Sequence, residues 1–321
     1  LKPHTEIRMK SQYVHTLKEG DYVNDYFVAT RKDLRNRQTG GKFLGMVFQD
    51  KTGDIGGVMW NNAIEIARVF EVGDVVSVRG RVQSYQGRLQ IQVDQVLPLR
   101  EGDFNSADLV AVNEDSEDNW EKFLAVLNSI KDPWLSKLRD LLLEDTAFIE
   151  EFRHAAAAKK WHHEYRGGLV RHCHEMATIA ETMCVLYPDL NRDLLLLSVF
   201  LHDAGKVDEM THDLVVDYTT AGKLIGHLQI GCDLVQEKMR LIEGFPEKLR
   251  LEILHCILSH HGELVNGSPM VPKTLEAIVL HHIDNLDAQA AAFTRIIREA
   301  RANGQEWSEY QPLIERVVWA K

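Results

Sequence analysis

The sequence is poor in the residues that build covalent cross-links or membrane spans. Its 321 residues include only four cysteines, and no two of them form a CxxC pair. They are scattered within segments of helical pattern, which predicts buried thiols in a reducing compartment rather than a disulfide framework or a structural zinc cluster. No apolar run approaches the roughly 20 residues that a membrane helix requires, and the stretch LKPHTEIRMK lacks the apolar core of a secretory signal. These absences predict a protein of the reducing cytoplasm with no membrane partner.

Basic residues are outnumbered along the chain, and the net charge is −11. The acidic excess is unevenly distributed, however. Residues 1–100 contain 15 Lys and Arg against 11 Asp and Glu, a balance of +4, whereas residues 101–321 contain 22 against 37, a balance of −15. This asymmetry predicts that a mildly basic part, suited to gripping a polyanion, is joined to a part with another task. The length also favours two domains over one.

The first hundred residues have the composition of short strands. Segments rich in Val, Ile and aromatic residues alternate with turns that contain Gly, Asn or Asp. The expected strands are 25–34, 41–50, 53–60, 74–83 and 87–96. Between the third and fourth strands, residues 61–70 have apolar side chains at helical spacing. Five short strands with a helix in this position are the layout of an OB-fold barrel, which is therefore predicted for residues 1–100.

Beyond this barrel, residues 101–118 are acidic and lack a periodic pattern, which predicts a linker. From Trp120 onward apolar residues recur at helical spacing, so residues 119–321 are predicted to form an all-α bundle. The expected helices are 120–131, 134–145, 147–160, 168–187, 192–205, 218–241, 247–262 and 273–302. The predicted fold class is thus multidomain, with an N-terminal all-β barrel and a C-terminal helical bundle.

Histidine is the residue that the helical part has in excess. The chain contains 15 histidines, and several stand in segments otherwise made of Leu, Val and Ile. In SVFLHDAGK, an apolar run carries His202 and Asp203 into the interior, where such a pair is costly unless partners or a metal satisfy it. A single histidine on an apolar helix face is more often a hydrogen-bonded core residue, so the argument depends on the set. The set is His172, His202, Asp203, His227, His260, His261 and Asp284.

Imidazole and carboxylate ligands without cysteine suit Mn, Fe, Co, Zn or Ni. The order H…HD…H…HH…D, with HDAGK after an apolar helix, resembles the HD-domain metal-dependent phosphohydrolases over roughly residues 160–300. The strings WHHEYRGGLVRH, GHLQIG and ILSHHGELVNGSPMVPKTLEAIVLHHIDNLDA, together with the predicted OB-fold, extend the resemblance. They make nearly the whole chain similar to the YhaM family of 3′→5′ exoribonucleases.

This resemblance implies a ligand set for one or two divalent ions, with Mn²⁺ favoured. The first site would be formed by His172, His202, Asp203 and Asp284. The second would be formed by His227, His260 and His261, with Asp203 bridging the two ions. Other histidines nearby are expected to pack or to support the ligands through hydrogen bonds, namely His174, His255, His281 and His282.

The resemblance also implies the reaction, which is hydrolysis of a phosphodiester by a metal-activated hydroxide that attacks phosphorus in line. Asp203 and Lys206 would be catalytic, with Lys206 in contact with the phosphate. His163 and Arg166, preceded by His162, belong to the run ahead of the first ligand. They are predicted to face the substrate, with a cap over the site as the alternative.

The predicted barrel would bind a single strand through basic side chains and aromatic platforms. The candidates are Arg35, Arg37, Tyr85 and Arg88, with Tyr85 exposed in a turn and Phe48 and Trp60 in the barrel core. The predicted partner is single-stranded RNA, or single-stranded DNA. Self-association is a further expectation, because a barrel on a linker could help to close a channel around the strand.

Two other functions fit parts of the sequence. One is an HD phosphohydrolase of small nucleotides in which the OB-like domain serves assembly. The other is a nucleic-acid-binding protein with an inactive HD site, which is disfavoured because every ligand position of the motif is present. The basic barrel favours a 3′→5′ exonuclease over both.

Overall fold

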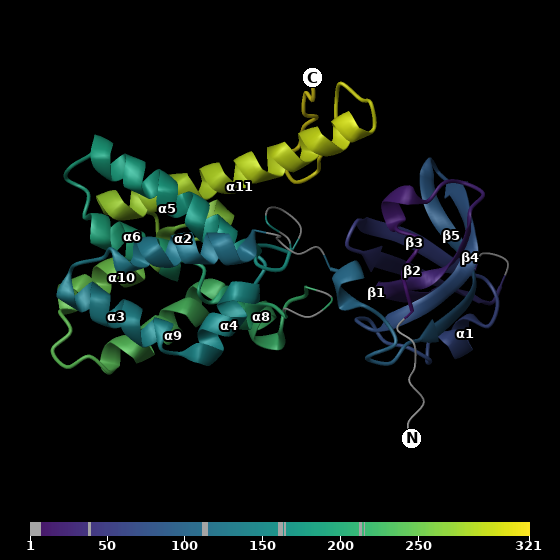
Figure 1. Cartoon of the computed structure of the whole chain (residues 1–321), viewed down its shortest axis with the longest axis horizontal. Coiled ribbons are helices and arrows are strands. Elements are labelled where there is room, and N and C mark those ends of the chain that lie inside the picture. Colours follow the sequence, from purple (N-terminus) through teal and green to yellow (C-terminus); the bar gives the residue numbers. More distant parts are fainter. Residues whose placement is uncertain are drawn as a thin grey trace. The chain divides into compact units, whose positions relative to one another are not determined.

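The computed structural model describes residues 8–37, 40–110, 115–159, 163, 165–211, 214 and 216–321 (Figure 1). The chain divides into two compact units, residues 1–112 with 213–215 and residues 113–212 with 216–321, and each is considered by itself. His162 lies outside the described residues. Among the helices of the described ranges, none is both long enough and apolar enough to cross a membrane.

The first unit is a closed five-stranded barrel with the strand order β1-β2-β3-β5-β4. Its strands are β1 (Tyr22–Asn36), β2 (Lys42–Asp50), β3 (Gly53–Met59), β4 (Val75–Tyr85) and β5 (Arg88–Pro98). β3 and β5 pair in parallel and close the barrel, while the other neighbours are antiparallel. The short helix α1 (Ala63–Ile66) lies between β3 and β4 in sequence. The predicted OB-fold is thereby confirmed.

Alternating side chains fill the barrel. Along β2, buried residues alternate with partly exposed ones, as expected for a strand with one face on the core. Phe27 and Phe48 are fully buried, with ring centroids 6.3 Å apart. Gly80 lies at a bulge between β4 and β5, where β5 approaches so closely that no side chain fits. Gly57 makes room for one of the core rings, since a Cβ there would lie 2.4 Å from Cε2 of Phe48.

Part of the predicted linker is packed rather than extended. The 3₁₀ helix η2 (Ser106–Asp108) is followed by Leu109, which is fully buried beside Tyr26, Val28 and Val75. At the other end of the predicted linker, α2 begins at Ser116. The domain limits drawn from the sequence stay predictions.

The second unit is helical, as predicted. Its helices are α2 (Ser116–Asn128), α3 (Pro133–Leu143), α4 (Thr146–His154), α5 (Gly168–Leu186), α6 (Arg192–Leu201), α7 (Lys206–Glu209), α8 (Thr220–Leu224), α9 (His227–Arg240), α10 (Glu247–Ser259) and α11 (Leu275–Ala302). Two further 3₁₀ turns are η1 (Val14–Thr16) in the first unit and η3 (Leu264–Asn266) in the second. The central α5 contacts α2, α4, α6 and α11.

The core of the helical unit centres on α6, whose residues from Leu194 to Leu201 are all buried. Phe200 packs its ring against Phe123, Phe148 and Phe152, with centroids 5.1–6.2 Å apart. Because α6 is surrounded, the residues that follow it are also delivered into the interior. This placement is what the apolar run before His202 predicted.

The helix predicted over 147–160 ends early, as α4 at His154, and two other predicted helices are broken. The segment 218–241 is divided into α8 and α9 by Gly226, whose φ of +80° is unfavourable for a residue with a side chain. The segment 192–205 ends its helix at Leu201, and the chain turns through Asp203 and Gly205 into α7. Both breaks occur next to histidines of the predicted set.

The close approach at Gly80 gives a test of the barrel. A Cβ on Gly80 would lie 2.3 Å from the carbonyl oxygen of Gln92 and 2.8 Å from Cγ2 of Ile91, so Gly80→Ala must displace backbone. Overpacking of this kind costs about 1–3 kcal/mol of stability. We expect faster amide hydrogen exchange in β4 and β5, measured by mass spectrometry. Gly56→Ala is the matched control, because its Cβ would lie 3.7 Å from Gln90; equal protection in the two variants would contradict the packing account.

Candidate metal centre

Seven side chains from five helical segments converge at one point of the helical unit. His172 comes from α5 and Asp284 from α11, while His202 and His260 are the C-cap residues of α6 and α10. His227 is the first residue of α9. The remaining members, Asp203 and His261, directly follow His202 and His260. The structure thus brings together every residue of the predicted ligand set.

Asp203 lies in the middle of this cluster and is almost completely buried. Its Oδ2 is 3.3 Å from Nε2 of His202 and 4.0 Å from Nε2 of His172. Its Oδ1 is 3.5 Å from Nε2 of His227 and 3.7 Å from Nε2 of His260. One carboxylate therefore faces imidazoles on both of its oxygens.

The ligating atoms divide into two groups around this carboxylate. One atom each from His172, His202 and Asp284 lies within 4.8 Å of the others, and the same holds for His227, His260 and His261. The described residues also bring His202, Asp203 and His260 together at this spacing. The arrangement offers two adjacent sets of nitrogen and oxygen donors that could hold divalent metal ions.

Hydrogen bonds fix which nitrogen of each ring faces the centre. Nδ1 of His202 is 2.9 Å from the carbonyl oxygen of Val199, and Nδ1 of His260 is 2.8 Å from that of Ile257. A carbonyl oxygen can only accept, so each Nδ1 carries the hydrogen, and in the neutral ring Nε2 is left with a lone pair. In His202 this lone pair points at an oxygen of Asp203. Two acceptors that face one another need a cation between them.

The buried polar atoms of the centre agree with this requirement. Within the described parts of the chain, Nε2 of His202 and of His227, Oδ1 of Asp203 and Nδ1 of His261 are buried and make no hydrogen bond. Buried polar atoms are rarely left in this state, because the loss of hydration costs free energy. Divalent cations bound in the two groups would satisfy these atoms, so the residues fit a metal centre.

The electrostatics of the centre favour an ionised Asp203 and a neutral His260, but they favour a protonated His172. Burial opposes ionisation of Asp203, but the ammonium of Lys206 and the imidazole of His202 outweigh it and hold its pKa well below the usual range. Burial, with His202 and His261 nearby, holds the pKa of His260 well below its usual range. For His172 burial is outweighed by the hydrogen bonds to carboxylates, which raise its pKa to about 9. A metal would have to displace the proton from this ring.

The glycine of HDAGK has a steric role. A Cβ on Gly205 would lie 2.1 Å from the carbonyl oxygen of His227 and 2.5 Å from the backbone nitrogen of Gly231. Only a residue without a side chain lets the turn after α6 lie against the first turn of α9. This contact brings His227 to Asp203.

Lys206 is held against the same carboxylate. Its Nζ donates hydrogen bonds to Oδ2 of Asp203 and to the carbonyl oxygen of Ala157, both at 2.6 Å, and its side chain is 12% exposed. Burial opposes its charge, but Asp203 outweighs burial and raises the pKa of Lys206. A cation therefore lies at the edge of the candidate centre.

Two carboxylates that the sequence did not single out lie behind the ligands. Oδ2 of Asp287 is 2.6 Å from Nδ1 of His172, and Oε1 of Glu209 is 2.9 Å from Nδ1 of His227. Asp287 follows Asp284 by three residues on α11, and this helical spacing is the signal that could have revealed it. Glu209 has no such signal, because α7 is short and its partner lies 18 residues away.

The two residues expected to face substrate lie in different environments. His163 is buried, and its Nε2 is 3.1 Å from Oδ2 of Asp287. Arg166 is exposed.

The four neighbouring histidines are placed outside the groups of donor atoms found among the described residues. His281 supports a ligand, since its Nδ1 is 2.7 Å from the carbonyl oxygen of His260. His255 accepts a hydrogen bond from the backbone nitrogen of Lys273, and His282 is exposed. His174 follows His172 by two residues on α5, so it points to another side of the helix.

On the barrel, aromatic and basic side chains line a groove of about 370 Å³. Phe43, Trp60 and Tyr85 border it together with Arg31 and Arg35, and both arginines are paired with Asp33, also in the lining. The predicted Tyr85 is 60% exposed at the tip of the β4–β5 hairpin, and Arg88 is exposed in the same hairpin.

The prediction that Trp60 belongs to the barrel core is wrong, whereas Phe48 is buried as predicted. Trp60 follows the last residue of β3, whose side chain points inward, so the indole turns outward and is 41% exposed. Its ring lies 5.0 Å from that of Phe43, and the guanidinium of Arg37 lies 5.2 Å from its centroid. The result is a partly exposed pair of aromatic rings, inclined by 33°, with the guanidinium of Arg37 over the indole.

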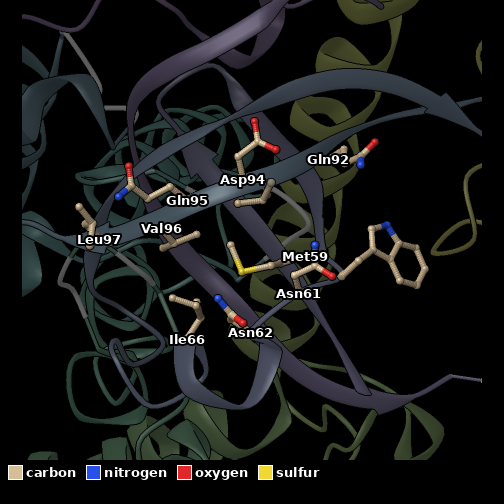
Figure 2. A pocket seen from close by; sticks show the side chains of 11 residues that line it. Met59, Asn61, Asn62, Ile66, Gln92, Asp94, Gln95, Val96 and Leu97 are labelled. Atoms are coloured by element: carbon tan, nitrogen blue, oxygen red, sulfur yellow. The ribbon is translucent and has the colours of Figure 1, made fainter. Parts of the chain in front are cut away.

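A second hollow, of about 360 Å³, adjoins Trp60 on the barrel. Figure 2 shows its lining, with Asn61 and Asn62 following β3, Ile66 from α1, and the side chains of β5 across from them. Met59, Val93 and Val96 are buried there, while the amides are exposed. The exposed amides are those of Asn61, Asn62, Gln92 and Gln95.

Comparison with known proteins agrees with this geometry. Residues 169–289 match the family model of the HD domain, and residues 28–99 match that of the OB-fold nucleic acid binding domain. Among solved structures, the second OB-fold domain of replication protein A from Methanococcus maripaludis is 24% identical and aligns over 29% of this chain and 97% of that one. Its TM-score is 0.23, so it adds no information on function.

Curated relatives match over most of their length. The 3′-5′ exoribonuclease YhaM of Geobacillus sp. (strain WCH70) is 33% identical over 286 residues, which cover 88% of this chain and 87% of the relative. The protein of the same name from Bacillus velezensis is 32% identical over 284 residues, covering 88% and 90%. The chain therefore belongs to the YhaM family.

Proposed function

We propose that this protein is a metal-dependent 3′→5′ exoribonuclease that hydrolyses phosphodiester bonds of single-stranded RNA. The observation that carries the proposal is the convergence of five histidines and Asp284 around the buried carboxylate of Asp203, with several donor atoms that make no hydrogen bond. The polarity and the substrate are proposed by analogy with the YhaM relatives, which are named 3′-5′ exoribonucleases.

His172, His202, Asp203 and Asp284 would hold one ion, and His227, His260 and His261 a second, with Asp203 shared. Divalent ions bound here would lower the pKa of water from about 15.7 towards about 7 and offset charge on the phosphate. The donors are imidazoles and carboxylates without thiolates, which suits Mn²⁺, Fe²⁺, Co²⁺, Zn²⁺ or Ni²⁺. Among these we infer Mn²⁺ by analogy with the family that the chain resembles.

Three side chains of the helical unit besides the histidines have specific roles in this proposal. Asp203 supplies the shared negative charge, and its low pKa keeps it ionised. Lys206 is within reach of the same carboxylate and would offer its remaining N–H to a phosphate oxygen. Arg166, which is exposed, would contact the RNA backbone.

The barrel would hold the RNA upstream of the cleaved bond. Bases would stack on Phe43, Trp60 and Tyr85, while Arg37 and Arg88 would pair with phosphates. A base beyond Trp60 would meet the amides of the second hollow, which can donate and accept hydrogen bonds. Self-association would extend this surface and can be measured as mass in solution by light scattering.

The first prediction concerns the shared carboxylate. Asp203→Asn keeps the shape of the side chain but removes the charge that both donor groups face, so Mn²⁺ retention and hydrolysis should both be lost while the helix content stays the same. The assay follows 5′-labelled single-stranded RNA with Mn²⁺ and with EDTA. Asp208→Asn, an exposed acid five residues further on, is the control that should remain active.

In this assay wild-type protein should give a ladder that shortens from the 3′ end only with metal. Full activity of Asp203→Asn would refute the centre. Intact RNA beside hydrolysed small nucleotides would instead assign the centre to nucleotide hydrolysis.

The second prediction separates Lys206 from the ligands. Lys206→Met keeps the length of the side chain and removes its charge, so kcat should fall by roughly 100-fold or more, as when one preorganised donor to a reacting oxyanion is lost. Mn²⁺ should still bind, as measured by chelator competition. Lys206→Arg should recover part of the activity, and an unchanged kcat in Lys206→Met would contradict the proposed contact with phosphate.

The third prediction tests the aromatic pair on the barrel. Stacking on an aromatic side chain contributes about 1–3 kcal/mol per base, so Trp60→Ala should weaken RNA binding by about 10- to 100-fold. Binding is measured by fluorescence anisotropy in EDTA, which prevents hydrolysis. Tyr22→Ala is the control, because this exposed tyrosine lies on β1 outside the groove lining. Equal affinities of the two variants would place the RNA elsewhere.

A further inference from the structure

A chain of buried hydrogen bonds extends from His172 away from the donor atoms of the centre. Oδ2 of Asp287 lies 2.6 Å from Nδ1 of His172 and 3.1 Å from Nε2 of His163. The side chains of Asp287 and His163 are only 6% and 3% exposed, and that of His172 is not exposed at all. One carboxylate oxygen therefore joins a candidate ligand to a second, buried histidine.

The chain continues beyond His163. Its Nδ1 lies 2.9 Å from the hydroxyl oxygen of Tyr165, and Arg171 donates to that same oxygen from Nη1 at 3.3 Å. Arg171 in turn donates from Nε to Glu175 at 2.8 Å. The chain thus ends on two side chains that are more than a third exposed.

The donors and acceptors along this chain are mutually consistent. Arginine only donates, so the Tyr165 oxygen accepts from Arg171 and its hydroxyl hydrogen is available to Nδ1 of a neutral His163. His163 then donates from Nε2 to Asp287, and His172 donates to the same oxygen from Nδ1. In the neutral form of His172, which metal binding requires, this order leaves the lone pair on Nε2, the nitrogen that lies 3.3 Å from Oδ1 of Asp284.

The backbone of His163 is in a strained conformation. Its φ is +46°, a left-handed value that residues with a side chain seldom adopt and that persists only where the surroundings enforce it. Gly168 makes the conformation possible, because a Cβ there would lie 2.0 Å from the carbonyl oxygen of His163. The backbone at His163 is therefore strained in the conformation that holds its imidazole against Asp287.

We propose that Asp287 and His163 are positioning residues that set the tautomer and the orientation of His172 for metal binding. Neither residue has to touch the RNA, and the burial of His163 keeps it from the substrate-facing role expected from its place in the sequence. The inference rests on the proposed function to the extent that the centre binds divalent ions. It assigns roles to two residues outside the ligand set.

Asp287 is tested first. Asp287→Ala removes the acceptor behind His172, and the affinity for Mn²⁺ should fall by about 10- to 100-fold, the usual effect of losing a carboxylate behind a ligating histidine. Asp287→Asn should lose less, because its amide oxygen can still accept from His172. Affinity is measured by chelator competition, and the visible absorption of the Co²⁺-loaded protein reports ligand geometry. The thermal unfolding midpoint in EDTA separates a metal defect from a folding defect.

His163 needs a variant that does not add strain. His163→Gly removes the imidazole and suits the left-handed backbone, so it should fold as well as wild type. We expect about 10-fold weaker Mn²⁺ binding and a lower kcat, with the KM for RNA unchanged. His282→Asn, an exposed histidine on the same helix as Asp287, is the control that should leave all of these values unchanged.

The outcomes distinguish this inference from the proposed function. Wild-type Mn²⁺ affinity and Co²⁺ spectrum in both Asp287→Ala and His163→Gly would overturn the inference, whatever the activity on RNA. A raised KM in His163→Gly with normal metal affinity would overturn it in favour of substrate contact. If wild type binds metal and the variants weaken it as expected, but RNA is not hydrolysed, the proposed function fails and the positioning roles stand.

Discussion

The arrangement of the helical unit depends on one buried carboxylate, that of Asp203. Ionised groups are expensive to bury unless opposite charge and hydrogen bonds surround them. Here Lys206 meets one oxygen directly, and imidazoles from four helical segments face the two oxygens at 3.3–4.0 Å. Removing Lys206 would take away a cation that directly compensates this buried charge. The carboxylate therefore determines where those helices can end or begin.

The packing of the helical core delivers this charge to its place. α6 is buried along nearly its whole length, so the residue after its end cannot reach solvent. The HDAGK turn then needs Gly205, because α9 lies directly against it. Stability and the candidate site therefore depend on the same packing. The apolar contacts of Phe200 hold α6 in place, and His202 and Asp203 directly follow this helix.

The sequence predicted the parts of this protein that have a local pattern. The barrel and the ligand set were predicted, because strand alternation and apolar runs that end in His or Asp can be read locally. Glu209 was missed because its contact with His227 depends on how a short turn and a long helix meet. Trp60 was assigned to the core because a small barrel needs aromatic side chains to fill it, and only the end of β3 at Met59 shows that the indole points outward. Asp287 could have been predicted from the sequence, since it follows Asp284 by about one helical turn.

The two donor groups differ in charge, and this difference would affect how strongly each group binds a divalent ion. The group of His172 and His202 contains Asp284 in addition to the shared Asp203, whereas the group of His227, His260 and His261 has only the shared carboxylate. A divalent cation is stabilised more by two carboxylates than by one, because each contributes a full negative charge at short distance. The carboxylates behind the rings do not remove this difference, since Asp287 supports one group and Glu209 the other. The first group would therefore be the stronger site, and the second would depend on a carboxylate that the first also uses.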